Sequence, residues 1–380
     1  METGQLYYED CHQKSFTAQV LSCEETEKGY AVVLDQTAFY PEGGGQACDL
    51  GTLGDAKVLD VREKGTVIVH LCDKPVTGTV TGTLDWQRRF DLMQQHAGEH
   101  IVSGIIHKTY GYHNVGFHMG SDMVTIDFDG PIPADALAQI ERQANEAIWQ
   151  NLDIRCYYPS PEELENLTYR SKKALPWPVR IVEVPGIDRC ACCGVHVAKT
   201  GEIGLVKLFT CVKFHQGVRI EMACGGRAMD ILSRIYEQNR QVSQAFSAKI
   251  METGAAARKM NEALAAEKFR ATALEKQVFA SVAEAYRGSG NVLHFADDLA
   301  PGAVRELADA IATVCGGTAA VFSGGSVCLV NKAGDVKELG NRMAKALDGR
   351  GGGKPGFFQG SVRAEKSQIE GFFAEMWRDL

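Results

Sequence analysis

The sequence predicts an α+β protein built from four consecutive parts, and three observations support this. Short runs of β-branched and apolar residues, separated by glycine and charged residues, fill the N-terminal quarter of the chain. Apolar residues at spacings of three and four then alternate with such runs. Residues 229–286 contain no proline and a single glycine, which is typical of long helices. We therefore expect a β-barrel over 1–90, an α+β domain with a metal site over 91–228, a helical or coiled-coil segment over 229–287 and an α/β domain over 288–380.

Composition places the chain among ordinary globular proteins. It has 380 residues, of which 45% are apolar and 23% charged, and this length is enough for two or three cores. The polar N-terminus lacks an apolar signal segment and the chain lacks a long uninterrupted apolar run, so we expect a cytoplasmic protein without a membrane span. Twelve scattered cysteines are then expected to be free thiols.

The net charge of −8 argues against a protein that coats nucleic acid non-specifically. It does not exclude a nucleic-acid substrate, because phosphate contacts depend on local patches of Lys and Arg.

The first quarter of the chain has the pattern of a small barrel. Strands are expected at residues 31–34, 58–61 and 66–70, where apolar and β-branched residues gather. Between them, the segment 39–46 reads Phe-Tyr-Pro-Glu-Gly-Gly-Gly-Gln, and its proline and three glycines do not fit a regular strand. We expect a tight loop there that exposes its backbone.

The second part alternates helices with strands. Apolar residues recur at helical spacing over 85–107 and again over 133–150, after Pro133. Strands are expected at 123–128, 179–184 and 205–209.

The spacing of apolar residues and the positions of glycines predict the structure of the third and fourth parts. Apolar residues keep a three-four spacing between Ala257 and Val278, so we expect a long helix or hairpin that breaks at Gly254 and packs or dimerises. The last part is expected to hold three strands and three helices, with a glycine-rich loop over 349–356 before the final helix.

Two pairs of residues suggest a metal site. His96 and His100 lie four residues apart on the expected helix, so their side chains project from one face. Cys192 and His196 have the same spacing in a glycine-containing turn. One thiolate and three imidazoles are a ligand set that zinc accepts, with one ion per chain. Four protein ligands also fit a closed structural site, and Cys193 or Cys190 is an alternative ligand.

These motifs together resemble a known family. The His-x-x-x-His helix, the Cys-x-x-x-His turn and the upstream Phe-Tyr-Pro-Glu-Gly-Gly-Gly-Gln are similar to the editing domain of alanyl-tRNA synthetase and to its free-standing relatives, the AlaX alanyl-tRNA editing proteins. The glycine-rich tail resembles the DHH-associated domain of the longer members. The resemblance implies a zinc-dependent hydrolase that removes serine, and also glycine, from tRNA(Ala). No segment resembles an amino-acid-activating domain, so we expect deacylation without aminoacylation.

The resemblance also suggests roles for individual residues. Gln46 is expected to read the serine hydroxyl during catalysis, although a bracing role in the loop fits its position equally well. Basic residues near the motifs and in the tail loop are expected to contact tRNA phosphates. These residues are Arg88, Arg89, Arg170, Lys172, Lys173, Arg350 and Lys354. The chain departs from the family at Ala97 and Val195, where the family commonly has threonine, which leaves the preference between serine and glycine open.

Two other functions are compatible with parts of the pattern. The chain would be a non-catalytic tRNA-binding module if its zinc were structural. A phosphoesterase is suggested by the DHH-associated tail, but the sequence has no Asp-His-His triplet, and a thiolate ligand suits manganese and magnesium poorly.

Overall fold

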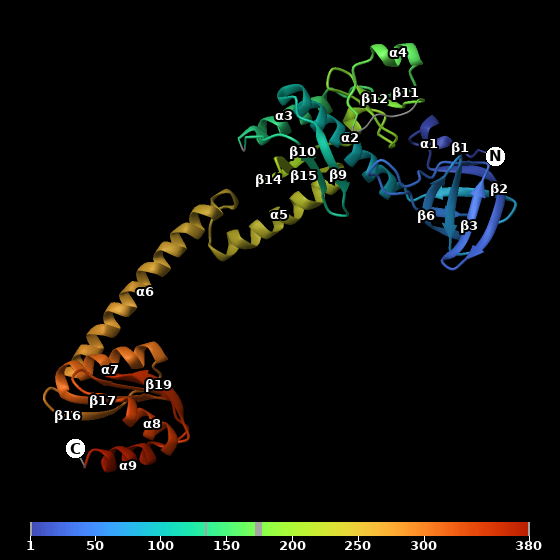
Figure 1. Ribbon diagram of the computed structural model, residues 1–380. Helices are drawn as coiled ribbons and strands as arrows, with labels where there is room; N and C mark the ends of the chain where they lie inside the picture. The colour runs from blue at the N-terminus through green and yellow to red at the C-terminus, as the bar shows by residue number, and fades with distance from the viewer. Residues whose placement is uncertain (1, 134, 172–176, 379–380) are drawn as a thin grey trace. The chain divides into compact units, whose positions relative to one another are not determined.

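The computed structural model describes residues 2–133, 135–171 and 177–378. The chain divides into two compact units, Met1–Gln241 and Val242–Leu380, and each is described by itself. The first unit joins a barrel to an α+β layer, and the second is a five-stranded sheet with helices (Figure 1). The mixed α+β class expected from the sequence is confirmed.

The first unit begins with a closed antiparallel barrel. Its strands follow the order β2-β3-β7-β6-β5-β8. Their bounds are Ser15–Thr26 for β2, Gly29–Leu34 for β3, Gly51–Leu53 for β5, Ala56–Lys64 for β6, Val67–Cys72 for β7 and Thr79–Leu84 for β8. Buried and exposed residues alternate along β8, so one face of each strand fills the barrel.

Three short elements close one side of the barrel. Strand β1 (Gly4–Gln5) pairs in parallel with β4 (Gln36–Thr37), and α1 (Leu6–Glu9) follows β1 directly. The glycine-rich segment 39–46 lies between β4 and β5 outside any strand, as the sequence predicts. Its backbone turns through positive φ at Gly44 and Gly45.

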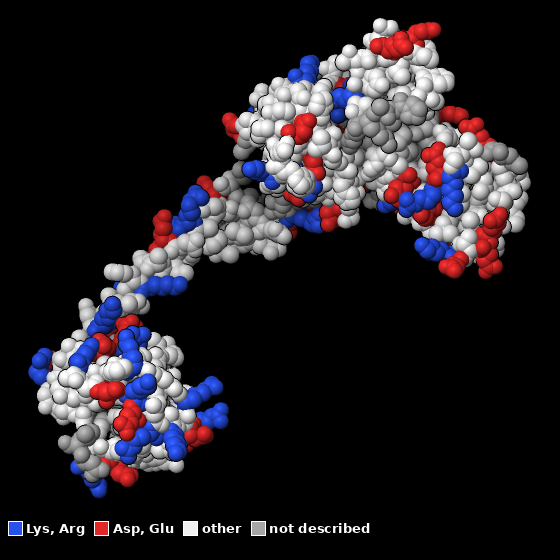
Figure 2. All heavy atoms as spheres, in the orientation of Figure 1, with Lys and Arg blue, Asp and Glu red and all other residues white. Residues whose placement is uncertain are grey.

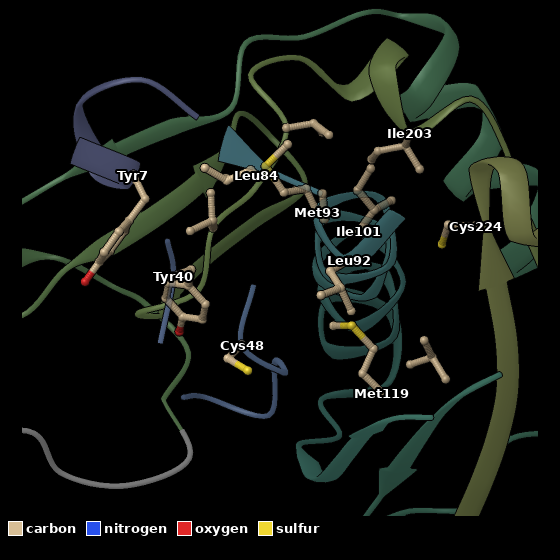
Figure 3. Packing of buried hydrophobic residues seen from close by; sticks show 14 of the residues in the cluster. Tyr7, Tyr40, Cys48, Leu84, Leu92, Met93, Ile101, Met119, Ile203 and Cys224 are labelled. Carbon is tan, nitrogen blue, oxygen red and sulfur yellow. The ribbon is translucent and has the colours of Figure 1, made fainter. Parts of the chain in front are cut away.

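The long helix α2 (Trp86–Tyr110) is the centre of the first unit. Asp85 caps its N-terminus by accepting a hydrogen bond from the Arg88 N–H, and Gly111 ends it in the left-handed conformation. Side chains on several faces of α2 are buried, including Leu92, Met93 and Ile101 (Figure 3). Such burial all round is unusual for a surface helix and makes α2 a core element.

Two sheets and three helices surround α2. The larger sheet has the order β14-β15-β10-β9 and the smaller one β11-β12-β13. Their bounds are Asn114–Met119 for β9, Val124–Phe128 for β10, Arg155–Tyr157 for β11, Ile181–Val184 for β12, Asp188–Ala191 for β13, Val206–Phe214 for β14 and Gly217–Cys224 for β15. The helices are α3 (Ala136–Trp149), α4 (Pro161–Asn166) and the 3-10 turn η1 (Thr200–Ile203). Helix α5 (Gly225–Ala245) follows β15.

The second unit is a sheet with helices on both faces. A 3-10 turn, η2 (Ile250–Glu252), leads into α6 (Thr253–Glu284). The sheet order is β16-β17-β18-β20-β19, with bounds Gly290–Phe295, Gly316–Ser323, Ser326–Asn331, Phe357–Ser361 and Arg350–Lys354 respectively. Helices α6 and α7 (Pro301–Cys315) pack in one hydrophobic cluster, and α8 (Lys337–Ala346) and α9 (Lys366–Met376) in the other.

Two sequence predictions about this region are wrong. The helical stretch is interrupted after α5, between Phe246 and Lys249, and Gly254 lies inside α6, because residues around Ser247 leave the helical path through a positive φ. Residues 350–354 form strand β19, paired with β20, where a loop was expected. Glycine lets these two strands approach closely, since a Cβ at Gly353 would lie 2.0 Å from the Phe357 carbonyl oxygen.

Helix α6 leaves a row of apolar side chains exposed. Met260, Leu264, Leu274 and Val278 are all more than half exposed, and dimerisation through this row stays a prediction. Among the described residues, no helix is both long and apolar enough to cross a membrane.

The barrel contains a buried histidine whose protonation should limit acid stability. His70 is fully buried between the Thr37 hydroxyl at 2.9 Å and the Val32 carbonyl at 3.2 Å, and burial lowers its pKa to about 4. Because the unfolded pKa near 6.5 is higher, stability is complete above that value and falls as the pH drops toward 4. We expect a loss of about 2 kcal/mol between pH 7 and pH 5, measured by urea unfolding. His70→Gln should lack this step, whereas equal pH dependence in both proteins would contradict the assignment.

Candidate metal centre

Four side chains that are distant in sequence meet beside α2. His96 and His100 come from two successive turns of α2, and Cys192 and His196 come from the turn after β13. Their ligand atoms all lie within 4.8 Å of one another. The Cys192 Sγ is 3.4 Å from His96 Nε2 and 3.8 Å from His196 Nε2, and the three imidazoles are almost fully buried.

Hydrogen bonds on the far side of two rings fix their orientation. His96 Nδ1 lies 2.9 Å from the Gln46 Oε1, and His100 Nδ1 lies 2.9 Å from an Asp188 oxygen. The two carboxylate oxygens of Asp188 also accept two hydrogen bonds from Arg170, at 2.7 and 2.8 Å. Both acceptors hold the Nδ1 proton, so the Nε2 atoms are free to act as ligands.

Close packing at two glycines makes this arrangement possible. A Cβ at Gly194 would lie 2.2 Å from the His96 ring. A Cβ at Gly104, one turn after His100, would lie 2.6 Å from the Asp188 Cβ. Side chains at these positions would push the thiol turn and the Asp188 carboxylate away from α2.

Arg180 holds the thiol turn from the other side. Its guanidinium donates to the carbonyl oxygens of Cys192 and Gly194, at 3.0 and 2.9 Å. It also lies over the ring of Tyr8, 4.3 Å from the ring centroid, and the Tyr8 hydroxyl donates to the Cys193 carbonyl. The turn is therefore anchored before any ligand binds.

Burial and the neighbouring charges shift the pKa values of the side chains in this cluster. Burial alone would lower the pKa of His100, but its hydrogen bonds to Asp188 and Cys192 raise that pKa well above its usual value. Burial opposes a thiolate at Cys192, yet the neighbouring His96 and His196 lower the pKa of this thiol well below its usual value. Burial and the nearby His96 lower the pKa of His196 to about 3. A thiolate at Cys192 beside the neutral imidazole of His196 suits a borderline-soft divalent cation.

The donor set fits zinc. It consists of one thiol and three imidazole nitrogens, all directed at one point, and the buried His196 Nδ1 has no partner among the described residues. Cys193 points elsewhere, with its Sγ 3.8 Å from the Tyr40 hydroxyl, and Cys190 belongs to a second group with His100 and Asp188. Neither of them joins the four-membered group, although both stay close to it.

A cavity of about 510 Å³ opens beside the four side chains, large enough for a small organic ligand. Its polar walls come from α2, from the thiol turn and from the segment around Arg170. Aromatic side chains complete it, namely Tyr8, Phe117 and Tyr158. The cavity and the cluster share His96, His100 and Cys192.

Gln46 and Arg89 both lie in buried surroundings. Gln46 is fully buried and does not line the cavity, because its carbonyl oxygen accepts from His96 and from the Val195 N–H. This placement fits the bracing role, and a contact with a substrate hydroxyl stays a prediction. Arg89 is also fully buried and forms a core ion pair with Asp49, with a further hydrogen bond to the Ala38 carbonyl, and its contact with tRNA stays a prediction.

The other basic residues have different surroundings. Arg88 is half-buried and donates to the Cys48 carbonyl, and Arg170 lines the cavity while paired with Asp188. Arg350 and Lys354 are exposed at the two ends of β19, and Figure 2 shows Lys and Arg side chains spread over the visible face of this unit. Lys172 and Lys173 lie outside the described residues.

Sequence reasoning missed Asp188, Arg180 and Tyr8. Asp188 and Arg180 lie close to the Cys-x-x-x-His turn, and charged residues in strands that read as buried were an available signal. Tyr8 had no such signal, since it reaches the thiol turn only through the fold of the barrel.

Comparisons with known proteins identify what this chain is similar to. Residues 3–88 match the family described as tRNA synthetases class II (A), and residues 179–236 match the threonyl and alanyl tRNA synthetase second additional domain. The chain is 27% identical to the alanyl-tRNA editing protein Aarsd1-A of Xenopus laevis over 95% of both chains. The chain is thus similar to alanyl-tRNA editing proteins over nearly its whole length. The mouse protein Aarsd1 is also 27% identical, over 95% of this chain and 94% of its own length.

The chain is also similar to alanine–tRNA ligases. The ligase of Ignicoccus hospitalis is 35% identical over 64% of this chain, and that of Thermofilum pendens is 32% identical over 96% of it. The matches span only 28% and 43% of the two ligases, so this chain corresponds to part of each.

The Asp188 carboxylate should control metal affinity. Asp188→Asn removes the anionic acceptor behind His100, and we expect zinc affinity to fall by about 10- to 100-fold in competition with a chromophoric chelator. Asp127→Asn is a matched control, because Asp127 is held by Arg219 through the same two-bond geometry on β10. Equal affinity in the wild type and the Asp188 variant would contradict this role.

Proposed function

We propose that this chain hydrolyses the ester that joins a wrongly attached amino acid to tRNA(Ala), with serine as the main substrate and glycine as a second one. The similarity to alanyl-tRNA editing proteins over nearly the whole chain supports the reaction class. The single observation that carries the proposal is the convergence of His96, His100, Cys192 and His196 beside a cavity.

We infer that these four side chains hold one zinc ion. When bound, zinc supplies a Lewis acid that polarises an oxygen or orients the acceptor end of the substrate. The four protein donors favour orientation, because they fill the tetrahedral positions that zinc prefers.

The surrounding residues act by holding this geometry. Gln46 and Asp188 accept hydrogen bonds from the Nδ1 atoms of the two α2 histidines. Arg180 and Tyr8 fix the thiol turn. The substrate ester is already activated toward water, so a fixed and partly closed cavity contributes chiefly by placing the ester carbonyl correctly. Selection of serine over alanine then falls to polar groups on the cavity wall.

Contacts to the body of the tRNA are proposed for exposed basic residues. Arg350 and Lys354 flank three glycines of the edge strand β19, where phosphates can approach the backbone closely. Arg88, Lys172 and Lys173 stay proposed contacts to the tRNA. The division into four domains and the cytoplasmic location also remain proposals.

The decisive experiment compares three substrates with and without chelator. We expect rapid deacylation of seryl-tRNA(Ala), slower deacylation of glycyl-tRNA(Ala) and almost none of alanyl-tRNA(Ala), with activity lost after removal of metal and restored by zinc. Cleavage that ignores the amino acid or the chelator would overturn the proposal.

His96→Ala separates the enzyme from a binding module with structural zinc. We expect deacylation to fall by a factor of about 100 or more while circular dichroism and tRNA binding are kept. His118→Ala is the control, because this histidine is exposed on β9. Global unfolding of the His96 variant would favour the structural role.

Replacement of both Arg350 and Lys354 by alanine should weaken tRNA binding. Each lost phosphate contact lowers the slope of log affinity against log salt by about 1, so we expect a slope smaller by 1 to 2. The control Lys28→Ala changes an exposed residue of the barrel. An unchanged slope would remove β19 from the tRNA contact surface.

A further inference from the structure

Glu99 is a buried carboxylate on the wall of the cavity. It lies on α2 between the two histidines of the cluster, is 5% exposed and lines the cavity together with His96, His100 and Arg170. No role follows for it from the metal cluster, since it is not one of the four converging side chains.

One oxygen of Glu99 is fixed by two donors. The Ser103 hydroxyl, one turn along α2, donates to Oε1 at 2.6 Å, and the Asn114 amide donates to the same oxygen at 2.5 Å. The Asn114 amide also contacts the Ser103 hydroxyl at 3.3 Å, which closes a three-membered network. Among the residues that the structure describes, Oε2 accepts no hydrogen bond and is also not enclosed, so it is left for a ligand in the cavity.

Within the described part of the chain, Glu99 also forms no ion pair, and its interaction with the charge of Arg170 acts over a longer distance. The nearby Arg170 is engaged by both oxygens of Asp188, and the guanidinium of Arg180 is bound to the carbonyl oxygens of the thiol turn. A carboxylate removed from water without a cation is unfavourable. The arrangement therefore fits a ligand that brings a positive charge into the cavity.

We propose that Glu99 binds the α-ammonium group of the aminoacyl ester. This inference rests on the proposed function, because an amino acid esterified to tRNA carries one cation, its free α-ammonium, next to the ester carbonyl. An ammonium held at Oε2 places that carbonyl beside the metal cluster. Glu99 is thus a specificity-determining residue that makes the site select esters of free amino acids over neutral acyl esters.

The fixed geometry favours this role over that of a general base. A base that takes a proton from water needs no cation, and its loss would slow every ester alike. An ammonium receptor acts on one class of substrate only. The two roles therefore predict different patterns across substrates.

The test uses seryl-tRNA(Ala) and its α-hydroxy analogue, in which a hydroxyl replaces the ammonium and the size of the acyl group is nearly unchanged. Each rate is divided by the uncatalysed rate of the same ester. For the wild-type chain we expect kcat/KM to favour the amino ester by roughly 10- to 100-fold, the range of one charge-assisted hydrogen bond. Glu99→Gln keeps an oxygen for Ser103 and Asn114, and should reduce this preference to about threefold or less, mainly through KM for the amino ester.

The outcomes separate the possible failures. An equal loss on both esters in Glu99→Gln would show a general base or a structural role, and a wild-type chain that does not distinguish the esters would rule out the receptor. Absence of cleavage of either ester by the wild type would instead overturn the proposed function. The control Glu146→Gln removes an exposed carboxylate from α3 and should leave both rates unchanged.

Discussion

The structure of the site depends on two buried hydrogen bonds behind the imidazoles of α2. Gln46 accepts from His96, and Asp188 accepts from His100, so both rings present Nε2 to the Cys192 thiol. The two acceptors come from different parts of the first unit, one from the glycine-rich loop next to the barrel and one from β13. The barrel, the small sheet and α2 must therefore be packed correctly before the four donors can meet.

This packing requires glycine at particular positions of the sequence, where the backbone approaches a side chain closely. Gly194 leaves room for the His96 ring, and Gly104 leaves room for Asp188 against α2. Gly44 is similar, because a Cβ there would lie 2.9 Å from the Cys193 Sγ, and its φ of +58° is one that glycine adopts without strain. Glycines of the helix, the loop and the thiol turn thus permit one compact arrangement of side chains that are distant in sequence.

Local sequence patterns predicted the helices and strands better than they predicted the contacts between them. The spacing of Phe90, Met93 and Ile101 is sufficient to predict α2, and His96 and His100 follow as neighbours on one face. The hydrogen-bond partners of Gln46 and the burial of Arg89 were not predictable, because both depend on which parts of the chain pack against these residues. Strand β19 was missed for a related reason, since its glycines read as a loop and only pairing with β20 makes them a strand.

Charged side chains of this chain have different roles, depending on whether they are paired inside the fold or available to a ligand. Arg89, Arg170 and Arg180 are occupied by internal acceptors in the first unit, so they hold the fold and the site together. Among the described walls of the cavity, the Glu99 Oε2 is the anionic atom that stays available to a ligand. The exposed cations proposed to contact the tRNA, Arg350 and Lys354, lie on the second unit. On the proposed function, a carboxylate of the protein would bind the cationic acyl group of the substrate, and cations of the protein would bind its phosphates. A net charge of −8 is therefore compatible with a nucleic-acid substrate.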